Sequence, residues 1–464
     1  MKKEQFVYIS IWCSTVIYSI YRFSTATHKY FQHYRDNFGD FTRGIAFLSS
    51  KRDKSDIEFE AILFITENLL PWLLVHLLVG RFIRVYVQSP RVLKVWQILF
   101  SVTYILLKLN FMCLLILSIQ PLVFYVVKRI YPMKTTIIWL LTSSFLVILN
   151  YLKSTISDKE PLETFQLTDC ELYSIIIGLF WMNLKCTSYN LETDKIDLLD
   201  FFSYCFYLPT FFTGPFLLYE NFRRSFELSN PPPDFTKFSK NVAKGLLYLL
   251  ALYTTLHFVY VNAVAYHLQF INDLDSWCLY GYGYTMGQYF HIKYLVQYGL
   301  STSMASCDGV KVPNLPRCIG RVHLYSDMWR YFDMGLYEFL VKHIYVPSSG
   351  LFEGNKPLRS FLCFAFVYFW HGLEKHVLVW SLLNYSGIIV ENLWMKKKEE
   401  CGRKDCFFMA VLLAMSAVSN FYFFAGTDVG NVFVKRLFTD IQGSLWLLLA
   451  LYCCCKTSIE LRRV

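Results

Sequence analysis

A histidine at the end of a long apolar run is the first residue of this sequence that could carry out proton chemistry. His371 lies in the segment Phe366–Gly372 (FVYFWHG), and a further apolar run begins at Val377. An ionisable group at membrane depth costs about 2.5–3.5 kcal/mol, so its presence there indicates a function. A neutral imidazole can accept a proton near pH 7, as a general base must. A hydrogen-bonded core histidine is the alternative interpretation, and the residues alone leave both open.

An aspartate between aromatic residues is the second candidate. Asp333 belongs to the segment Ser326–Gly335 (SDMWRYFDMG). If this segment is helical, Trp329 and Asp333 occupy positions i and i+4 and share one face. Arg330 is then close enough to form an ion pair with Asp333, which is the simpler alternative to a catalytic role.

Basic residues near Asp333 could contact phosphate groups. Lys311, Arg317, Arg321 and Arg330 fall within one stretch, and arginine binds phosphate through paired hydrogen bonds. Ordinary charge at the cytosolic end of a membrane helix would produce the same pattern. Cys318, next to Arg317, is a candidate haem ligand or acylation site, with a plain loop thiol as the default interpretation.

A metal centre is not predicted. The string His371–His376 (HGLEKH) contains two histidines and a glutamate. Its H-x-x-E-x-H spacing matches neither H-E-x-x-H nor H-x-x-E-H. Cys401 and Cys406 also lack a matching second pair of cysteines.

The composition indicates that these residues lie in a membrane protein. The chain has 464 residues, of which 55% are hydrophobic and 17% are charged, with 33 Tyr and 42 Phe. Soluble domains are about a quarter charged. The formal net charge of +10 comes from basic residues that flank apolar runs. This pattern is typical of membrane topology and does not indicate nucleic-acid binding.

Apolar segments cover nearly the whole chain, which predicts an all-α, polytopic transmembrane bundle. A spanning helix needs about 20 mostly apolar residues, and several segments fall short, so some re-entrant or tilted helices are expected. We expect roughly ten or eleven membrane segments in one domain, residues 1–464, with a catalytic core at about 200–430, and an uncleaved N-terminal signal anchor. The candidate segments are Phe6–Tyr21, Ala61–Ile83, Val92–Leu107, Phe111–Tyr131, Thr135–Leu152, Leu172–Asn183, Val242–Ala265, Ser360–Trp380, Phe407–Phe424 and Ser444–Cys455.

The sequence resembles the membrane-bound O-acyltransferase family. The membrane-embedded Trp370-His371-Gly372 motif carries the general resemblance, together with Pro209, Gly214-Pro215 and Ser419-Asn420. The segment Pro316–Pro347 (PRCIGRVHLYSDMWRYFDMGLYEFLVKHIYVP) is similar to the Hedgehog acyltransferase branch, and most similar to its insect form.

This resemblance implies a protein palmitoyltransferase. The implied donor is palmitoyl-coenzyme A, and the implied acceptor is the N-terminal cysteine of a secreted signalling protein, Hedgehog or, in insects, a Spitz-type ligand. His371 resembles the catalytic histidine, and Asp333 occupies the second catalytic position, where many relatives that acylate lipids or hydroxyls carry Asn. Cys318 resembles a haem-linked cysteine of the vertebrate enzyme. The substrate-binding candidates are Trp329, Arg330, Trp370, Asn420, Arg317 and Arg321.

Other functions stay open on the residues alone. One rival is O-acylation of a lipid or serine hydroxyl. Another is a proton-coupled transporter that uses His371 and Asp333 as a relay, and a third is a non-catalytic scaffold. The expected location is the endoplasmic reticulum or Golgi membrane, with membrane lipid as a further partner.

Overall fold

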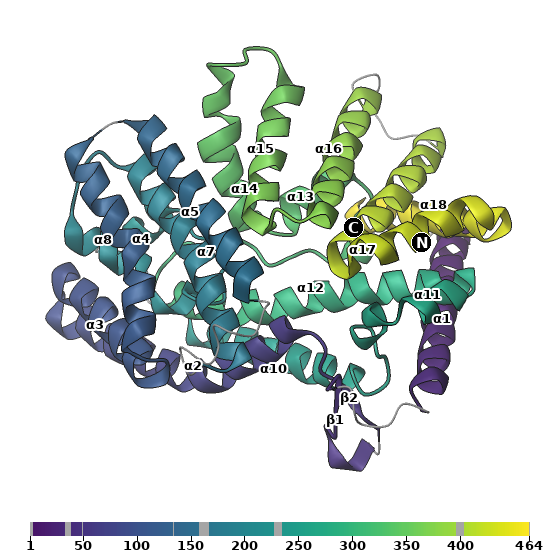
Figure 1. Cartoon of the computed structure of the whole chain (residues 1–464), viewed down its shortest axis with the longest axis horizontal. Coiled ribbons are helices and arrows are strands. Elements are labelled where there is room, and N and C mark those ends of the chain that lie inside the picture. The colour runs from purple at the N-terminus through teal and green to yellow at the C-terminus, as the bar shows by residue number, and fades with distance from the viewer. Residues whose placement is uncertain are drawn as a thin grey trace.

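The computed structural model describes residues 3–32, 39–48, 50–132, 134–156, 167–226, 234–395 and 403–463. Almost all ordered elements are helices, and a two-residue antiparallel pair, β1 with β2, is the sheet found in these ranges. Figure 1 shows the helices gathered into one bundle, with α12 running through its middle. The predicted all-α, polytopic membrane fold is confirmed.

The helices have the following bounds: α1 Lys3–Phe31, α2 Ile57–Phe82, α3 Pro90–Lys108, α4 Phe111–Ile130, α5 Thr135–Ile156, α7 Asp169–Glu192, α8 Leu198–Cys205, α9 Tyr219–Arg224, α10 Phe235–Thr255, α11 Leu268–Asp273, α12 Ser276–Cys307, α13 Tyr325–Tyr331, α14 Met334–Leu340, α15 Lys356–His371, α16 Lys375–Met395, α17 Arg403–Thr439 and α18 Ile441–Arg463. The strands are β1 Phe41–Thr42 and β2 Arg52–Asp53.

Seven helices of the described residues are long and apolar enough to cross a membrane by themselves: α1, α2, α3, α4, α5, α17 and α18. Many of their large apolar side chains are exposed, as lipid-facing surfaces require. Helix α7 was expected to cross as well, but most of its residues are enclosed by protein. The expected total of ten or eleven crossings would need further helices such as α7, α10 and α16, and it stays a prediction.

Two expected spans have different bounds in the structure. Ser360–Trp380 is divided between α15 and α16, because Gly372 ends α15 with a φ of 146°. Val242–Ala265 is helical only to Thr255, where α10 ends. In addition, α17 has a kink at Gly426, whose φ and ψ of 82° and −178° are not helical.

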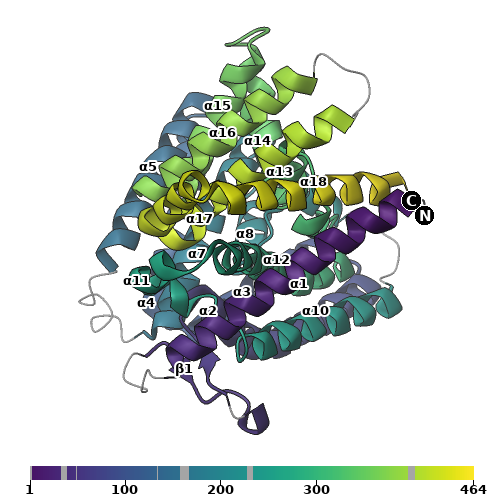
Figure 2. The same ribbon diagram turned by 90° about the vertical axis from the view of Figure 1, so that its right-hand side faces the viewer.

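Helix α12 is the element around which the bundle is organised. It has 32 residues, and twenty of them are buried, including polar ones such as Gln297 and Ser303. It packs against α1 and α10 on one side and against α17 on another, and Figure 2 shows α1 crossing the bundle beside it. No helix was expected here, because the many Tyr, Gly and Ser residues of this segment obscure the apolar pattern.

Candidate active site

His371 and Asp333 line the same cavity. It has a volume of about 130 Å³ and is enclosed by residues of α12, α13, α14, α15, α16 and α17. Aromatic and aliphatic side chains form most of its wall, among them Phe290, Trp380 and Phe423. The two groups are far apart in the sequence and come from the ends of different helices. Tertiary folding therefore brings the two predicted catalytic residues to one space.

The chain positions His371 by ending α15 there. Gly372 follows with a φ of 146°, a conformation that residues with a side chain rarely adopt. A Cβ at this position would also lie 1.9 Å from Oε2 of Glu374. The terminal carbonyl of α15, that of His371, accepts a hydrogen bond from Nζ of Lys153 on α5 at 3.2 Å. The glycine of the Trp-His-Gly motif thus allows the turn that leaves the imidazole beside the cavity.

Replacement of Gly372 by alanine is expected to lower the free energy of unfolding by about 1–3 kcal/mol, because the backbone conformation becomes strained. Transfer activity should fall as well, since His371 is the adjacent residue. Thermal denaturation in detergent and turnover per folded protein measure the two effects. Gly350→Ala is the matched control: Gly350 has an ordinary negative φ, and its Cβ would meet only Pro347 O at 3.7 Å. Equal behaviour of the two variants would contradict this role of Gly372.

Aromatic rings fix the orientation of the His371 imidazole. Its centroid lies 5.2 Å from that of Trp380 and 5.2 Å from that of Phe423, with interplanar angles of 85° and 87°. Trp370 makes a third edge contact at 4.7 Å. Within the described residues, no side chain hydrogen-bonds to the imidazole. Its nitrogens are therefore available to a bound substrate, which suits a proton acceptor.

Asp333 is held by two hydrogen bonds. The hydroxyl of Tyr298, on α12, donates to Oδ2 at 2.7 Å, and the backbone N–H of Leu336 donates to Oδ1 at 2.9 Å. The second bond makes Asp333 the N-cap of α14. This capping explains locally why the chain starts a new helix after Asp333.

These contacts correct two expectations about Asp333. Trp329 and Asp333 do not share one helix, because α13 ends at Tyr331. In the described part of the chain, the aspartate pairs with Tyr298 and has no ion pair with Arg330. It also makes no direct hydrogen bond to the His371 ring there.

Trp329 is fixed by a residue that the sequence did not identify. Its Nε1 donates to Oδ1 of Asn384 at 3.1 Å, and Nδ2 of Asn384 donates to the Trp380 carbonyl at 2.7 Å. Trp329, Asn384 and Trp380 all line the cavity. An amide within an apolar run is a signal that the sequence contains, but only the fold shows which tryptophans Asn384 contacts.

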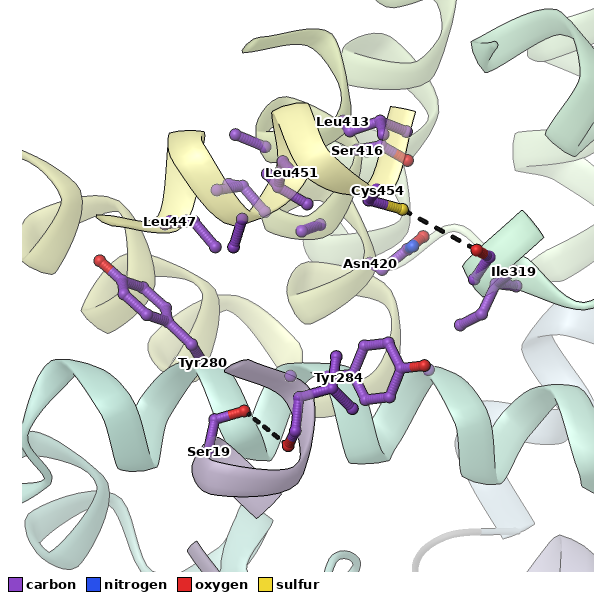
Figure 3. A pocket seen from close by; sticks show the side chains of 18 of the residues that line it. Ser19, Tyr280, Tyr284, Ile319, Leu413, Ser416, Asn420, Leu447, Leu451 and Cys454 are labelled. Atoms are coloured by element: carbon purple, nitrogen blue, oxygen red, sulfur yellow. Dashed lines mark hydrogen bonds between the residues drawn. The ribbon is translucent and has the colours of Figure 1, made fainter. Parts of the chain in front are cut away.

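Two further substrate-binding candidates, Trp370 and Asn420, also lie on the cavity wall. Asn420 belongs to a second cavity as well, of about 160 Å³, lined by α1, α12, α17 and α18. Figure 3 shows this second cavity, with Asn420 and Ile319 on one side and Tyr280 and Leu447 on the other. Four residues line both cavities: Gly287, Ile319, Met328 and Asn420. The two spaces are therefore direct neighbours.

The arginine candidates lie outside both cavities. Arg317, Arg321 and Arg330 are exposed. The guanidinium of Arg317 lies 3.5 Å from the ring centroid of Tyr331, and that of Arg330 lies 6.0 Å from the ring centroid of Tyr337. These cation–π contacts stabilise the surface around α13. The fold thus does not bring the arginines to the reaction cavity, and their contact with phosphates stays a prediction.

Cys318 lies beside the second cavity. It precedes the short 3₁₀ turn Ile319–Arg321 and is partly buried. The neighbouring second cavity is lined by Ile319, Gly320 and Cys454 but not by Cys318. Haem ligation at this thiol stays a prediction, and we derive no step through a haem. In the described ranges, no three His, Cys, Asp or Glu side chains lie together as metal ligands would.

Comparisons with known proteins identify the family of this chain. The protein-cysteine N-palmitoyltransferase Rasp of Drosophila melanogaster is 27% identical, across 95% of this chain and 91% of that protein. The protein-cysteine N-palmitoyltransferase HHAT of Mus musculus is 30% identical, across 54% of this chain and 55% of that protein. The membrane-bound O-acyltransferase GUP2 of Saccharomyces cerevisiae is 29% identical across 40% of this chain. The membrane-bound O-acyltransferase family model matches residues 109–429, a range that contains both His371 and Asp333, and the chain belongs to this family.

Proposed function

We propose that this acyltransferase moves palmitate from palmitoyl-coenzyme A to the N-terminal cysteine of a secreted signalling protein. The observation that carries the proposal is the placement of His371 and Asp333 on one enclosed, largely aromatic cavity. The similarity to two protein-cysteine N-palmitoyltransferases supports the choice of donor and acceptor. The Hedgehog and Spitz types of ligand are the acceptors that the family resemblance implies, and the endoplasmic reticulum or Golgi membrane is the proposed location.

The cavity provides what amide formation requires. The α-amine of the acceptor has a reference pKa near 8, so part of it is neutral at working pH. Its nitrogen attacks the thioester carbonyl, a C–N bond forms, and the C–S bond to coenzyme A breaks. The nitrogen loses a proton in this step, and the imidazole of His371 accepts it. The proton then returns to the departing thiolate, so that coenzyme A leaves as the thiol.

Asp333 holds the acceptor in this scheme. Tyr298 and the Leu336 N–H fix its carboxylate, which still has lone pairs available on both oxygens. A hydrogen bond from the substrate amine to this carboxylate would place the nitrogen between Asp333 and His371. Such positioning can supply several kcal/mol of the rate enhancement. The adjoining second cavity offers apolar space to a long acyl chain.

A competition between acceptors tests the proposal. Purified protein is incubated with palmitoyl-coenzyme A and a peptide that begins with Cys. We expect an amide that survives hydroxylamine, which cleaves thioesters. The same peptide with an acetylated N-terminus should receive no amide-linked palmitate, because acetylation blocks the α-amine that acts as the nucleophile.

O-acylation is the second candidate, because the yeast relative is a membrane-bound O-acyltransferase. Transfer to a lysolipid, or to the serine hydroxyl of an N-acetylated peptide, would support it. If either acceptor is used while the Cys peptide is not, N-palmitoyltransfer is contradicted. Proton transport without acyl transfer would contradict both N-palmitoyltransfer and O-acylation.

A further inference from the structure

A charged cluster joins the beginning of α2 to the middle of α12. Lys293, on α12, has a side chain that is only 5% exposed, and its Nζ lies 2.7 Å from Oδ2 of Asp56 and 2.6 Å from Oε2 of Glu58. Asp56 is the N-cap of α2, and Glu58 is in its first turn. We refer to Asp56, Glu58 and Lys293 as the α2 ion cluster. None of these three residues lines the reaction cavity.

The cluster is saturated with hydrogen bonds. Tyr289 donates to Oδ2 of Asp56 at 2.9 Å, and Tyr294 donates to Oε1 of Glu58 at 3.1 Å. Removing charges from water costs several kcal/mol for each ion, and only good geometry with additional hydrogen bonds offsets that cost. Attachment of α2 to α12 could be achieved with apolar packing alone. The arrangement of specific charges and hydroxyls therefore indicates a requirement for fixed geometry.

The cluster leads to the reaction cavity through α12. The Tyr294 hydroxyl donates its hydrogen bond to Glu58, and Tyr294 also lines the cavity. Tyr298, one helical turn further, contacts the Tyr294 ring at a centroid distance of 5.1 Å and donates to Asp333. The Tyr294 ring also lies 5.8 Å from that of Phe332, the residue before Asp333. A continuous set of contacts thus connects Glu58 to Asp333.

We propose that the α2 ion cluster positions the acceptor side of the reaction cavity. Glu58 fixes the Tyr294 hydroxyl, Tyr294 supports Tyr298 and Phe332, and Tyr298 holds the Asp333 carboxylate. Glu58 is a positioning residue and touches no reacting atom. It also lies ahead of residues 109–429, the range that the family model matches. The inference rests on the proposed palmitoyl transfer, because it assigns the cluster an effect on that reaction.

Tyr294→Phe is the primary test, because it keeps the ring on the cavity wall and removes only the hydroxyl. We expect kcat for palmitoyl transfer to the Cys peptide to fall about tenfold, which corresponds to the loss of one hydrogen bond to a charged group. KM for palmitoyl-coenzyme A should change less than about twofold, since Asp333 acts on the acceptor. Glu58→Leu should lower kcat equally, and the double variant should be no slower than either single variant.

Glu58→Gln is the conservative variant that separates positioning from simple stability. The glutamine carbonyl can still accept from Tyr294, but its NH2 then faces Nζ of Lys293, so kcat should fall less than in Glu58→Leu without reaching the wild-type value. Asp308→Asn is the matched control, because Asp308 is also buried and bonded, to His76 at 3.1 Å and Tyr207 at 2.6 Å, but lies away from the cavity. It should lower thermal stability and leave kcat per folded protein unchanged.

Three results would overturn the inference. One is wild-type kcat in folded Tyr294→Phe protein. Another is an equal loss of kcat in Glu58→Gln and Glu58→Leu, and the third is strict additivity in the double variant. If the wild-type protein itself transfers no palmitate to the peptide, the proposed function fails, and this outcome is distinguishable because it does not depend on any variant.

Discussion

His371→Ala is expected to lower kcat by about a thousandfold, within the range of 10² to 10⁴ that general base catalysis contributes. In the proposed mechanism the imidazole is the proton acceptor for the attacking amine, and its ring is oriented by Trp380 and Phe423. The neutral alanine leaves the amine without a base at hydrogen-bond distance. Radiolabelled palmitate incorporated into the Cys peptide measures the loss.

A second histidine provides the control for this experiment. His376 lies on α16 shortly after His371, is partly buried and does not line the cavity. His376→Ala should retain activity within about twofold, as a substitution away from the reacting groups does. Gel filtration in detergent should show that both variants remain folded. A His371→Ala protein with the turnover of the wild type would remove the histidine from the mechanism.

Asp333→Asn is expected to lower kcat by about a hundredfold while the protein keeps its stability. Asparagine is as good an N-cap as aspartate, so the first turn of α14 should be retained. With the asparagine oxygen on the Leu336 N–H, the amide NH2 faces Tyr298, whose hydroxyl can accept a hydrogen bond from it instead of donating one. The substitution removes the negative charge that holds the acceptor amine in the proposed mechanism. A well-placed charge contributes roughly a hundredfold to kcat.

Asp333→Ala removes the cap as well as the charge. We therefore expect the same loss of kcat, together with about 1 kcal/mol of lost stability. Steady-state kinetics with varied peptide, beside thermal denaturation, separates the two effects. An Asp333→Asn protein as active as the wild type would restrict Asp333 to capping α14.

The positions of many helices were predictable from the sequence, but the residues at which helices end were less so. The apolar segments expected near α2, α4 and α5 are helices with similar bounds. Ser360–Trp380 looked continuous because Gly372 lies between two apolar runs, and an isolated glycine does not by itself reveal a positive φ. Helix α12 was missed because it is enclosed on all sides by protein and so needs no single apolar stripe.

The catalytic candidates were identifiable because an ionisable group inside an apolar run is rare. His371 had this signal, Asp333 was identified as an acid between aromatic residues, and both lie on the cavity. Tyr298, Asn384 and Phe423 had no comparable signal. Tyrosine, asparagine and phenylalanine are common in this chain, and their importance depends on which side chains they meet.

The amino-acid sequence by itself indicated the lipid surroundings and the candidate groups. Apolar runs of membrane length require lipid, and a histidine within one of them and an aspartate between aromatic residues are groups that can exchange protons. Tertiary structure decided which groups act together. The partner of Asp333 is Tyr298 on α12 and not the nearby Arg330, because capping of α14 turns the carboxylate towards that helix. Contacts between distant segments depend on the packing of the whole bundle, and no local spacing specifies that packing.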